Sequence, residues 1–503
     1  MAKAELMDFD KALELFEPVL GFEVHVELNT KTKMFSDAPN YFGGEPNTNI
    51  TPLDLGLPGS LPVVNEQAIK YSISLGLALG CSIAESSRFA RKNYYYPDTP
   101  KNYQISQFDE PIAYDGNVEV ELADGRKFQI SIERAHMEED AGKLTHVGGA
   151  TGRIQGADYS LVDYNRAGVP LVEIVTNMIF GAEKDAPELA KAYVSAIRDI
   201  VVSLGISDAK MERGNLRCDA NISLSPRGSG KLGTRTETKN VNSLRSVERA
   251  IRYEIQRQAA ILAKGGTIQQ ETRHWHEDTG VTSAGRPKSD ADDYRYFPEP
   301  DLLPVVPGAE LIEQLRLALP EAPAIRRRRL KESWGFTDLE FQDVLNSGLL
   351  VELEETVAAG ASAQSARKWW TGEIARLANV AGVDAASLVT PIHVSELIAL
   401  VEAGDLTDRL ARQVLEGVIA GEGAPHEVVE SRGLKVVSDD GALIAAIDTA
   451  LAAQPDVLAK IRDGKVQAAG AVIGAVMKAM RGSADAARVR ELVLERAQAP
   501  EAE

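Results

Sequence analysis

The stretch GFEVHVEL, residues 21–28, decides the fold of the first part of the chain. Read as a β-strand, its side chains alternate between two faces. The apolar set is Phe22, Val24, Val26 and Leu28, and the polar set is Glu23, His25 and Glu27. A row of carboxylate, imidazole and carboxylate is either the polar side of an ordinary half-exposed strand or a ligand set for a divalent cation. Matching carboxylates elsewhere in the chain favour the cation.

The bulk composition is that of a globular chain with several domains. Its 503 residues are too many for one core, so we expect about two to four domains. The only cysteines, Cys81 and Cys218, exclude a disulfide scaffold and fit a reducing cytosol. Neither a signal peptide nor a bilayer-spanning apolar run is recognisable, so we expect a cytoplasmic protein without a membrane partner. The net charge of −19 argues against nucleic-acid binding over the whole surface, but local basic patches remain compatible with it.

Further carboxylates follow in strand-like segments. A hairpin predicted over residues 117–134, with Asp-Gly at its turn, leads to HMEEDAGK at 136–143, which is either a solvated acidic turn or a cation site. Glu173 lies inside the apolar segment LVEIV, where a carboxylate needs a cation or an arginine as partner. RCDANIS and TRTETKN alternate in the same way and direct Asp219 and Glu237 outward from neighbouring strands, beside basic residues.

Two segments interleave cations with aromatic rings. RFARKNYYYPDTPKNYQISQFD, residues 88–109, is either an aromatic loop packed on the sheet or a place where phosphate meets charge and bases meet rings. SDADDYRYFPEPDLLPV, residues 289–305, combines acids, tyrosines and Arg295 among prolines and is predicted to be a rim loop at a domain end.

Helical periodicity dominates from about residue 308. The four-arginine run Arg326–Arg329 is either a solvated helix face or a contact for RNA phosphates. A glycine-rich break at 420–427 precedes a small module with Lys465, Lys478 and Arg481 among small residues. The predicted helices are 1–16 (ended by Pro18), 65–79, 184–204, 243–264, 309–319, 321–334, 337–345, 348–358, 363–381 and 393–403.

Together these residues predict metal-dependent phosphoryl transfer, with an RNA-borne substrate as an open alternative. Ligands without sulfur favour Mg²⁺ or Mn²⁺, and cations around them favour phosphate. The candidate ligands are Glu23, His25, Glu139, Glu173, Asp219 and Glu237. The candidate phosphate-binding cations are Arg91, Lys92, Lys143, Arg166, Lys239 and Arg295.

Seven motifs, in order over about residues 17–305, resemble the B-subunit family of aspartyl/glutamyl-tRNA(Asn/Gln) amidotransferases, the GatB family. They are GFEVHVEL, RKNYYYPDTPKNYQISQFD, HMEEDAGK, LVDYNRAGVPLVEIV, LRCDANISL, ETKNVNS and DDYRYFPEPDL. The end of the chain is similar to the YqeY-like tail of the same family.

The resemblance implies an α+β fold. We expect a mainly antiparallel cradle similar to carboxylate kinases of the glutamine synthetase type, then an all-α domain and a small YqeY-like helical tail. The expected parts are an N-terminal extension (1–16), the cradle (17–305), the helical domain (306–425) and the tail (426–503).

The resemblance also implies an ATP-dependent carbon–nitrogen ligase. A protein of this family uses ATP and Mg²⁺, with Mn²⁺ or a second cation as alternatives, to phosphorylate the side-chain carboxylate of Glu-tRNA(Gln) or Asp-tRNA(Asn). Ammonia then displaces the phosphate. The implied partners are the amidase A subunit, the small C subunit and the two tRNAs, without DNA.

Residue roles follow from matching the motifs to the family. His25 and Glu139 are expected to ligate the catalytic Mg²⁺, and Lys92 and Arg166 to act beside it. Completion of one or two cation sites is assigned to Glu23, Glu173, Asp219 and Glu237. Contacts to ATP or the tRNA acceptor end are assigned to Arg91, Asn93, Tyr94, Lys143, Lys239 and Arg295. Contacts to the tRNA body are assigned to Arg326, Arg327, Arg328, Arg329, Lys465, Lys478 and Arg481.

Two other functions stay open at this point. A free-standing ligase for a small carboxylate would need no tRNA, but the long helical C-terminal part argues against it. A non-catalytic tRNA-docking scaffold is disfavoured because clustered acids repel RNA unless a metal neutralises them.

Overall fold

The computed structural model describes residues 5–148, 156–287, 294–434, 440–480 and 484–498. The chain forms two compact units, Met1–Arg326 and Arg327–Glu503. The strands are β1 (Phe16–Glu27), β2 (Ser82–Ile83), β3 (Ala90–Asn93), β4 (Tyr103–Ser106), β5 (Ala113–Glu121), β6 (Lys127–Glu139), β7 (Lys143–Val147), β8 (Tyr159–Asp163), β9 (Pro170–Thr176), β10 (Leu216–Pro226), β11 (Thr236–Val241), β12 (Glu271–His276), β13 (Val281–Pro287) and β14 (Phe297–Pro298). All of them belong to the first unit.

Nine strands of the first unit form one sheet in the order β13-β12-β11-β10-β1-β9-β6-β5-β2. Neighbouring strands are antiparallel except β11 and β12, which run parallel. The predicted hairpin is β5 and β6, and GFEVHVEL lies in the central strand β1, between β9 and β10. The expectation of a mainly antiparallel sheet is confirmed.

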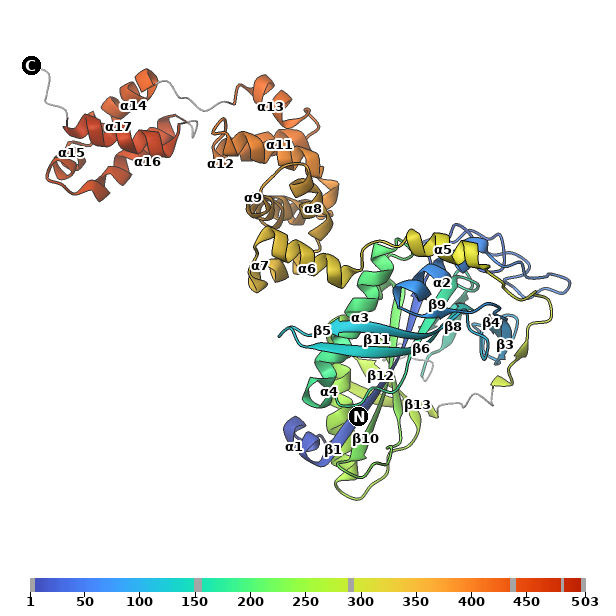
Figure 1. Ribbon diagram of the computed structural model, residues 1–503. Coiled ribbons are helices and arrows are strands. Elements are labelled where there is room, and N and C mark those ends of the chain that lie inside the picture. The colour runs from blue at the N-terminus through green and yellow to red at the C-terminus, as the bar shows by residue number, and fades with distance from the viewer. Residues whose placement is uncertain (1–4, 149–155, 288–293, 435–439, 481–483, 499–503) are drawn as a thin grey trace, which may run out of the picture. The chain divides into compact units, whose positions relative to one another are not determined.

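Helices cover one face of this sheet (Figure 1). The helices of the first unit are α1 (Phe9–Leu15), α2 (Glu66–Ala78), α3 (Ala186–Ser203), α4 (Leu244–Leu262) and α5 (Ala309–Leu317), with the short 3₁₀ turns η1 (Glu183–Asp185) and η2 (Met211–Arg213). As the alternation predicts, Phe22, Val24 and Val26 are buried against the helices, and Phe22 stacks on Tyr193 of α3 at 5.3 Å. Each such buried side chain contributes about 1.5–3 kcal/mol. The opposite face of β1 is left for the polar side chains.

The N-terminal helix differs from the prediction at its end. Helix α1 stops at Leu15, and Pro18 lies inside β1 instead of ending the helix. Proline is tolerated there because at Pro18 β1 pairs with β10, whereas its register with β9 begins only at Glu23. Helix α1 also packs into the core of the first unit through Phe9 and Leu13.

Two small sheets accompany the large one. Strands β14, β3 and β4 form a three-stranded sheet, in which β4 also contacts β6, and β7 pairs with β8. Helix α5 packs against the core of the first unit, although the predicted boundary at residue 305 places it in the helical domain.

The second unit is helical in its described residues. Its helices are α6 (Pro323–Trp334, across the unit boundary), α7 (Asp338–Ser347), α8 (Leu350–Ala358), α9 (Ala363–Lys368), the π-helix η4 (Trp369–Ile374), α10 (Ala375–Ala381), η5 (Ala385–Ser387), α11 (Pro391–Glu402), α12 (Asp408–Ile419), α13 (Pro425–Arg432), α14 (Asp440–Ala452), α15 (Pro455–Arg462), η6 (Val466–Ala468), α16 (Ala469–Ala479) and α17 (Ala486–Gln498). The helices predicted between residues 309 and 403 are confirmed to within a few residues at their ends.

Two separate hydrophobic cores hold these helices, one from Leu330 to Val429 and one from Leu443 to Ala497. The fully buried Trp370 donates from its indole N–H to the hydroxyl of Thr356 at 2.8 Å, which satisfies its polar atom. Among the described helices, no single one is long and apolar enough to cross a membrane. The bent pair α14 and α15 passes that test by length and composition.

Candidate active site

Four strands bring four polar side chains into one row on the face opposite the helices. His136 of β6 is paired with Glu173 of β9, Glu173 with His25 of β1, and His25 with Arg217 of β10. Directly opposed residues of antiparallel strands have Cβ atoms about 4.5–5.5 Å apart. Two residues beyond His136, on the same face of β6, lies Glu138.

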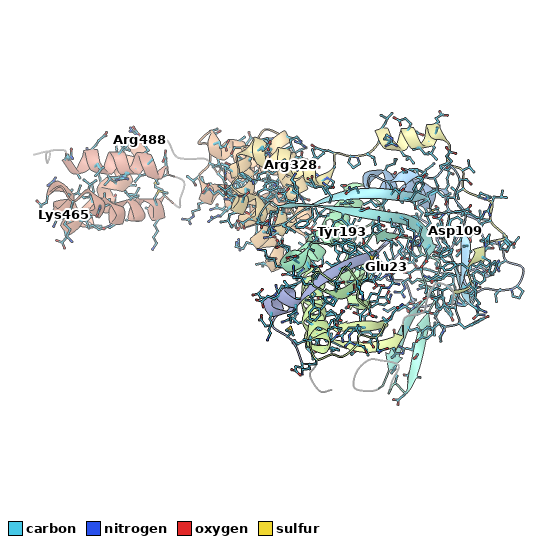
Figure 2. All side chains as sticks on the ribbon, turned by 60° about the horizontal axis from the view of Figure 1, so that its bottom comes forward. Glu23, Asp109, Tyr193, Arg328, Lys465 and Arg488 are labelled. Atoms are coloured by element: carbon cyan, nitrogen blue, oxygen red, sulfur yellow. The ribbon has the colours of Figure 1, made fainter. Side chains whose placement is uncertain are left out.

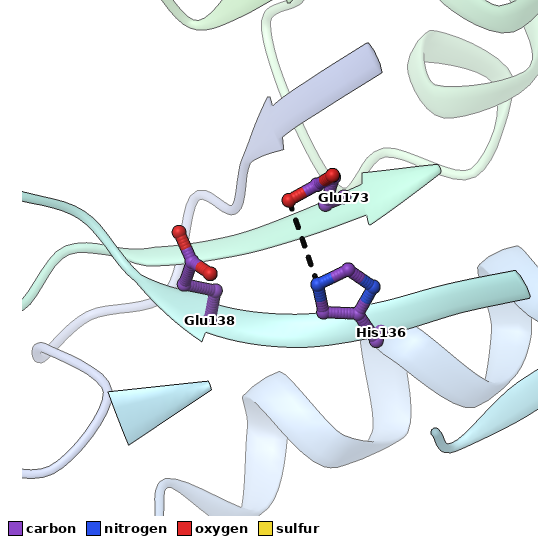
Figure 3. A group of neighbouring side chains, drawn as sticks. All are labelled: His136, Glu138 and Glu173. Carbon is purple, nitrogen blue, oxygen red and sulfur yellow. Dashed lines mark ion pairs between the residues drawn. The ribbon is translucent and has the colours of Figure 1, made fainter. Parts of the chain in front are cut away.

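The first candidate metal centre, the histidine cluster, consists of His136, Glu138 and Glu173. All three are buried, and they offer ligand atoms within 4.8 Å of one another. Figure 3 shows His136 and Glu173 facing each other from neighbouring strands, with Glu138 farther along β6. The Nε2 of His136 lies 3.5 Å from Oε2 of Glu173, and the Nε2 of His25 lies 3.4 Å from the same oxygen.

The charges of this cluster are mutually dependent. Burial alone would raise the pKa of Glu173, but His136 and His25 outweigh it and hold that pKa well below its usual range. Burial alone would lower the pKa of His25, whereas Glu173 and Asp219 outweigh it and raise that pKa. Glu173 and His25 therefore each shift the pKa of the other toward its charged form.

The residues of the histidine cluster fit a divalent cation. Two atoms that ligate one ion at about 2.1 Å lie roughly 3.0 Å apart at right angles and about 3.4 Å apart at the tetrahedral angle. Within the cluster, the Nε2 of His136 lies 3.5 Å from the Glu173 oxygen, and the Nε2 of His25, from outside the cluster, lies 3.4 Å from the same oxygen. The Nδ1 of His136 is buried without a hydrogen-bond partner in the described structure, so the ring is held through Nε2 alone. Nitrogen and carboxylate ligands without sulfur suit Mg²⁺ or Mn²⁺.

The second candidate metal centre, the carboxylate cluster, consists of Glu23, Asp219 and Glu237 on β1, β10 and β11. It contains an internal cation. The Nζ of Lys239 forms an ion pair with Asp219 and lies 3.7 Å from Glu237. Burial alone would lower the pKa of Lys239, but the two carboxylates raise it above its usual value.

Neutral donors complete the carboxylate cluster. The amide of Asn221 donates to Glu23 at 3.0 Å, and the hydroxyl of Thr272 donates to Glu237 at 2.9 Å. The sequence prediction that Asp219 and Glu237 lie on neighbouring strands beside basic residues is confirmed, and the structure adds that Lys239 contacts both.

Glu139 does not lie with His25. It follows Glu138 on β6 and therefore points to the other face, where it forms an ion pair with Lys101 and accepts from the backbone N–H of Ile105 at 2.8 Å. Burial raises the pKa of Glu139, and Lys101 lowers it only in part. Glu139 belongs to neither candidate metal centre in the described chain, because strand alternation separates it from His136 and Glu138.

A second pair of carboxyl groups lies at the end of the row. Asp140 forms an ion pair with Arg217 at 2.8 Å and lies 3.7 Å from Arg166, while Glu27 accepts from Asn215 at 2.9 Å. Burial and the neighbouring Asp140 raise the pKa of Glu27 to about 8. Burial would raise the pKa of Asp140 as well, but the two arginines hold it below its usual range.

Arg166 and Lys92 differ in what they contact. Arg166 donates to the backbone carbonyls of Ala141 and Gly142 at 2.9 and 2.8 Å, so it fixes the turn after β6. Lys92 reaches the histidine cluster, with its Nζ 3.4 Å from Glu138. Burial alone would lower the pKa of Lys92, but Glu138 leads the opposing influences that raise it well above its usual value. Lys92 is therefore a fixed positive charge beside the histidine cluster.

Three predicted nucleotide contacts hold the β3–β14 region together. Arg91 donates to both carboxylate oxygens of Glu299 at 2.7 and 2.9 Å. Asn93 donates to the backbone carbonyls of Tyr294 and Arg295 at 3.1 and 2.9 Å. Burial raises the pKa of Tyr94, whose ring meets Tyr294 edge to face. Their roles toward ATP or the acceptor end stay predictions.

The remaining predicted cations lie on exposed or half-exposed surfaces. Lys143 is exposed at the start of β7. On α6, Arg329 lies 3.1 Å from Glu354, and Arg328 is exposed (Figure 2). Lys465 and Lys478 are exposed in the last module, and Arg481 lies outside the described residues. The predicted contacts of these residues with the tRNA body stay predictions.

From the HMEEDAGK motif, Glu139 was predicted as a ligand, whereas the histidine cluster contains His136 and Glu138. Continuing the two-residue period of the hairpin strand, in which Ile130 and Ile132 are buried, would place Glu139 and not Glu138 on the polar face. The register shift between Ile132 and Arg134 reverses the faces, and the sequence carries no signal for it. Lys101, Asp140 and Arg217 are absent from the predicted site residues, because their ion pairs join residues far apart in the chain.

Comparison with known proteins identifies the class to which this fold and site belong. A model of the GatB/GatE catalytic domain matches residues 18–313, and a GatB domain model matches residues 352–496. The B subunit of aspartyl/glutamyl-tRNA(Asn/Gln) amidotransferase from Clavibacter michiganensis subsp. michiganensis (strain NCPPB 382) is 85% identical over 499 residues, covering 99% of this chain and 100% of that protein. The protein of the same name from Leifsonia xyli subsp. xyli (strain CTCB07) is 76% identical over 497 residues, with 99% and 100% covered. The chain therefore belongs to the family of aspartyl/glutamyl-tRNA(Asn/Gln) amidotransferase B subunits.

Proposed function

We propose that this chain activates the side-chain carboxylate of Glu-tRNA(Gln) or Asp-tRNA(Asn) with ATP and Mg²⁺, for which Mn²⁺ can substitute. A carboxylate oxygen attacks the γ-phosphorus of ATP, the bond to ADP breaks, and an acyl phosphate forms. Ammonia then attacks the carbonyl carbon, phosphate leaves with the pair of the C–O bond, and a proton is released. The product is Gln-tRNA(Gln) or Asn-tRNA(Asn), made by a carbon–nitrogen ligase.

One observation carries this proposal: a cation-fitting cluster of two carboxylates and a histidine lies beside a fixed lysine. The histidine cluster and Lys92 are joined by the 3.4 Å contact between Lys92 and Glu138. Phosphoryl transfer depends on positioning and charge neutralisation, which such an arrangement provides without a protein nucleophile. The names of the relatives support the substrate class.

The chain's own residues have distinct tasks in this proposal. A bound divalent cation would neutralise phosphate oxygens as negative charge moves onto ADP. Glu138, Glu173 and His136 would hold that cation, with His25 fixing the shared oxygen of Glu173. Lys92 would meet the transferred phosphoryl group, since its ammonium lies beside the histidine cluster. Arg217 and Arg166 hold Asp140 at the end of the row.

The proposal extends to partners and to the other parts of the chain. The relatives are named as one subunit of an amidotransferase, which implies a complex with other subunits. In such a complex an amidase A subunit would supply ammonia from glutamine, and a small C subunit would hold the amidase and this chain together. The helical domain and the tail would contact the tRNA body in the cytoplasm. We also propose that the fold of the sheet domain is similar to that of glutamine synthetase-type carboxylate kinases.

The test is ATP hydrolysis by this chain copurified with its A and C partners, in the presence of Mg²⁺. We expect stimulation by Glu-tRNA(Gln) or Asp-tRNA(Asn) but not by correctly charged tRNAs or by free glutamate. Glu173→Gln keeps the side-chain size, removes the shared charge and should lower the rate at least about 100-fold. Glu212→Gln, at an exposed glutamate outside both candidate metal centres, is the matched control.

Other outcomes would replace the proposal. Equal stimulation by free glutamate would indicate a small-molecule ligase. Tight tRNA binding without ATP turnover on any substrate would indicate a docking scaffold. Full activity of Glu173→Gln would remove the histidine cluster from the reaction.

A further inference from the structure

In the segment Tyr294–Phe297, the rings of Tyr294 and Tyr296 lie together, whereas the side chain of Arg295 lies elsewhere. Tyr294 and Tyr296 contact each other at 6.0 Å, whereas the guanidinium of Arg295 between them lies over Tyr95 at 6.0 Å. Arg295 has a φ of 46°, in the left-handed region that residues other than glycine seldom adopt. The segment therefore adopts a strained turn that separates the two tyrosine rings from the arginine.

Asn93 holds this strained turn in place. Its side-chain amide donates to the carbonyl oxygens of both Tyr294 and Arg295, the two residues that form the turn. The adjacent strand pairing of Phe297 with Arg91 fixes the other end. Strained backbone persists where the surroundings hold it, and it gathers at ligand-binding sites. The placement of the two rings is thus built into the first unit.

The rings form a continuous path from the histidine cluster to the surface. The ammonium of Lys92 lies 3.4 Å from Glu138 and 5.4 Å from the centre of the Tyr294 ring. Tyr294 contacts Tyr296, and Tyr296 stacks on Phe108 at 4.4 Å with only 7° between their planes. Phe108 is 44% exposed. We call Tyr294, Tyr296 and Phe108 the aromatic path.

We propose that the aromatic path is a stacking platform for the terminal adenosine of the substrate tRNA. This inference rests on the proposed function and deepens it, because it says how the acceptor end reaches the reacting carboxylate. Unpaired bases of RNA are bound by stacking on aromatic side chains next to cations. The aromatic path offers both, with Lys92 at its inner end and Arg295 beside its strained turn.

The exposure of the outer rings favours an RNA end over the adenine of ATP. A small nucleotide is usually enclosed in a concave pocket that covers most of its surface. Here Phe108 is 44% exposed and the neighbouring Phe297 is also 44% exposed, so the path opens to solvent at its outer end. A polymer whose last base alone enters needs such an open side, because the rest of the strand must leave the platform.

The experiment compares two forms of one tRNA, ending in -CCA and in -CC, for binding to the full chain. For the wild type we expect removal of the terminal adenosine to weaken binding roughly 5- to 100-fold. In Phe108→Leu and in Tyr296→Leu the two tRNAs should bind alike, because the adenosine has lost its stacking partner. Tyr159→Leu, at an exposed tyrosine of β8 away from the path, should keep the wild-type difference.

Each outcome is decisive for the platform. A variant that keeps the full difference between the two tRNAs overturns the proposal. So does a variant that leaves tRNA binding unchanged but weakens ATP binding, since the platform would then belong to ATP. Phe108→Leu is not expected to misfold, because the ring of Phe108 is half exposed. The thermal unfolding midpoint of Phe108→Leu should therefore match that of Tyr159→Leu.

Failure of the proposed function gives a different result. In that case the wild-type complex hydrolyses no ATP with mischarged tRNA, while the difference between -CCA and -CC tRNAs persists and depends on Phe108. That combination would keep the stacking platform and discard carboxylate activation.

Discussion

The two candidate metal centres are built from similar ligands on the same sheet, yet they differ in what balances their charge. In the histidine cluster, a buried carboxylate, Glu173, lies 3.4 and 3.5 Å from two imidazole nitrogens and forms no ion pair with a lysine or arginine of the described chain. In the carboxylate cluster, the permanent cation of Lys239 lies among the acids. A lysine ammonium already neutralises the carboxylates around it, so a metal ion gains less by binding there. A histidine can lose its proton and leave the carboxylate to a metal ion.

The comparison teaches that ligand type and proximity do not by themselves define a metal site. Both clusters bring three ligand atoms within 4.8 Å of one another. The neighbours decide the difference, because hydrogen bonds from Asn221 and Thr272 satisfy carboxylates that would otherwise attract a cation. We expect the histidine cluster to bind the divalent cation and the carboxylate cluster, whose acids are already balanced by Lys239, to bind none.

The largest expected effect is on cation affinity. Glu173→Gln removes the oxygen charge that both histidines share, and Mn²⁺ affinity measured by electron paramagnetic resonance should fall at least about 100-fold, because even partners behind a ligand contribute about 10- to 100-fold. Glu237→Gln removes a carboxylate from the other cluster and should leave Mn²⁺ affinity unchanged. Equal losses in the two variants would show that both clusters bind metal.

Removing the ammonium of Lys239 should turn the carboxylate cluster into a site that binds a divalent cation. Lys239→Met leaves three acids without their ammonium and should lower the free energy of unfolding by about 1–2 kcal/mol. This loss is smaller than the loss expected for breaking a fully buried ion pair, because Lys239 is partly exposed. The variant should also bind one more Mn²⁺ than the wild type and regain stability in its presence. Lys184→Met, at an exposed lysine of η1, is the control, and a count of bound Mn²⁺ that does not change would contradict the comparison.

The pH dependence of cation binding separates the clusters further. Glu173 and Asp219 raise the pKa of His25 against the lowering by burial, so a proton competes with the cation below that raised pKa. The Mn²⁺ affinity of the histidine cluster should therefore be constant at pH values above the raised pKa of His25. Below that pKa it should fall by about tenfold per pH unit. In Lys239→Met, titrations between about pH 6 and 8 should show a weaker dependence for the added ion, since carboxylates alone hold it.

The smallest expected effect concerns a hydrogen bond of the carboxylate cluster. Thr272→Val keeps the shape and removes the donor to Glu237, which should cost about 1 kcal/mol in the free energy of unfolding measured with urea. Cation affinity and ATP hydrolysis should stay at wild-type values. A loss of Mn²⁺ binding in this variant would place Glu237 in the metal centre after all.

Much of the fold could be predicted because strands and helices follow from the spacing of apolar residues within each segment. The alternation of GFEVHVEL predicted a strand with one buried face, and Val24 and Val26 are buried as expected. The helical periods after residue 308 predicted helices whose ends lie within a few residues of those observed. Helix α1 was harder, since Pro18 ends helices in general and only the one-sided pairing of β1 makes it acceptable in a strand.

The candidate site was predictable in part for the same reason. His25 and Asp219 were named because each alternates with apolar neighbours in its strand, Glu173 because it interrupts an apolar run, and Glu237 because it shares a strand face with Lys239. The choice of Glu139 over Glu138 shows the limit. Two adjacent acids are equivalent in composition, and only the register of β6 against β9 places one beside His136 and the other beside Lys101.

By itself, the sequence determined which residues form strands and helices, which face of each strand is polar, and to which family the chain belongs, because these properties depend on residue type and short spacing. The tertiary structure alone decided which carboxylates share a histidine and which share a lysine. Those partners come from five strands, β1, β6, β9, β10 and β11, and their meeting depends on strand order and register. Electrostatic energy depends on distances between atoms, and distances across a sheet exist only once the chain has folded.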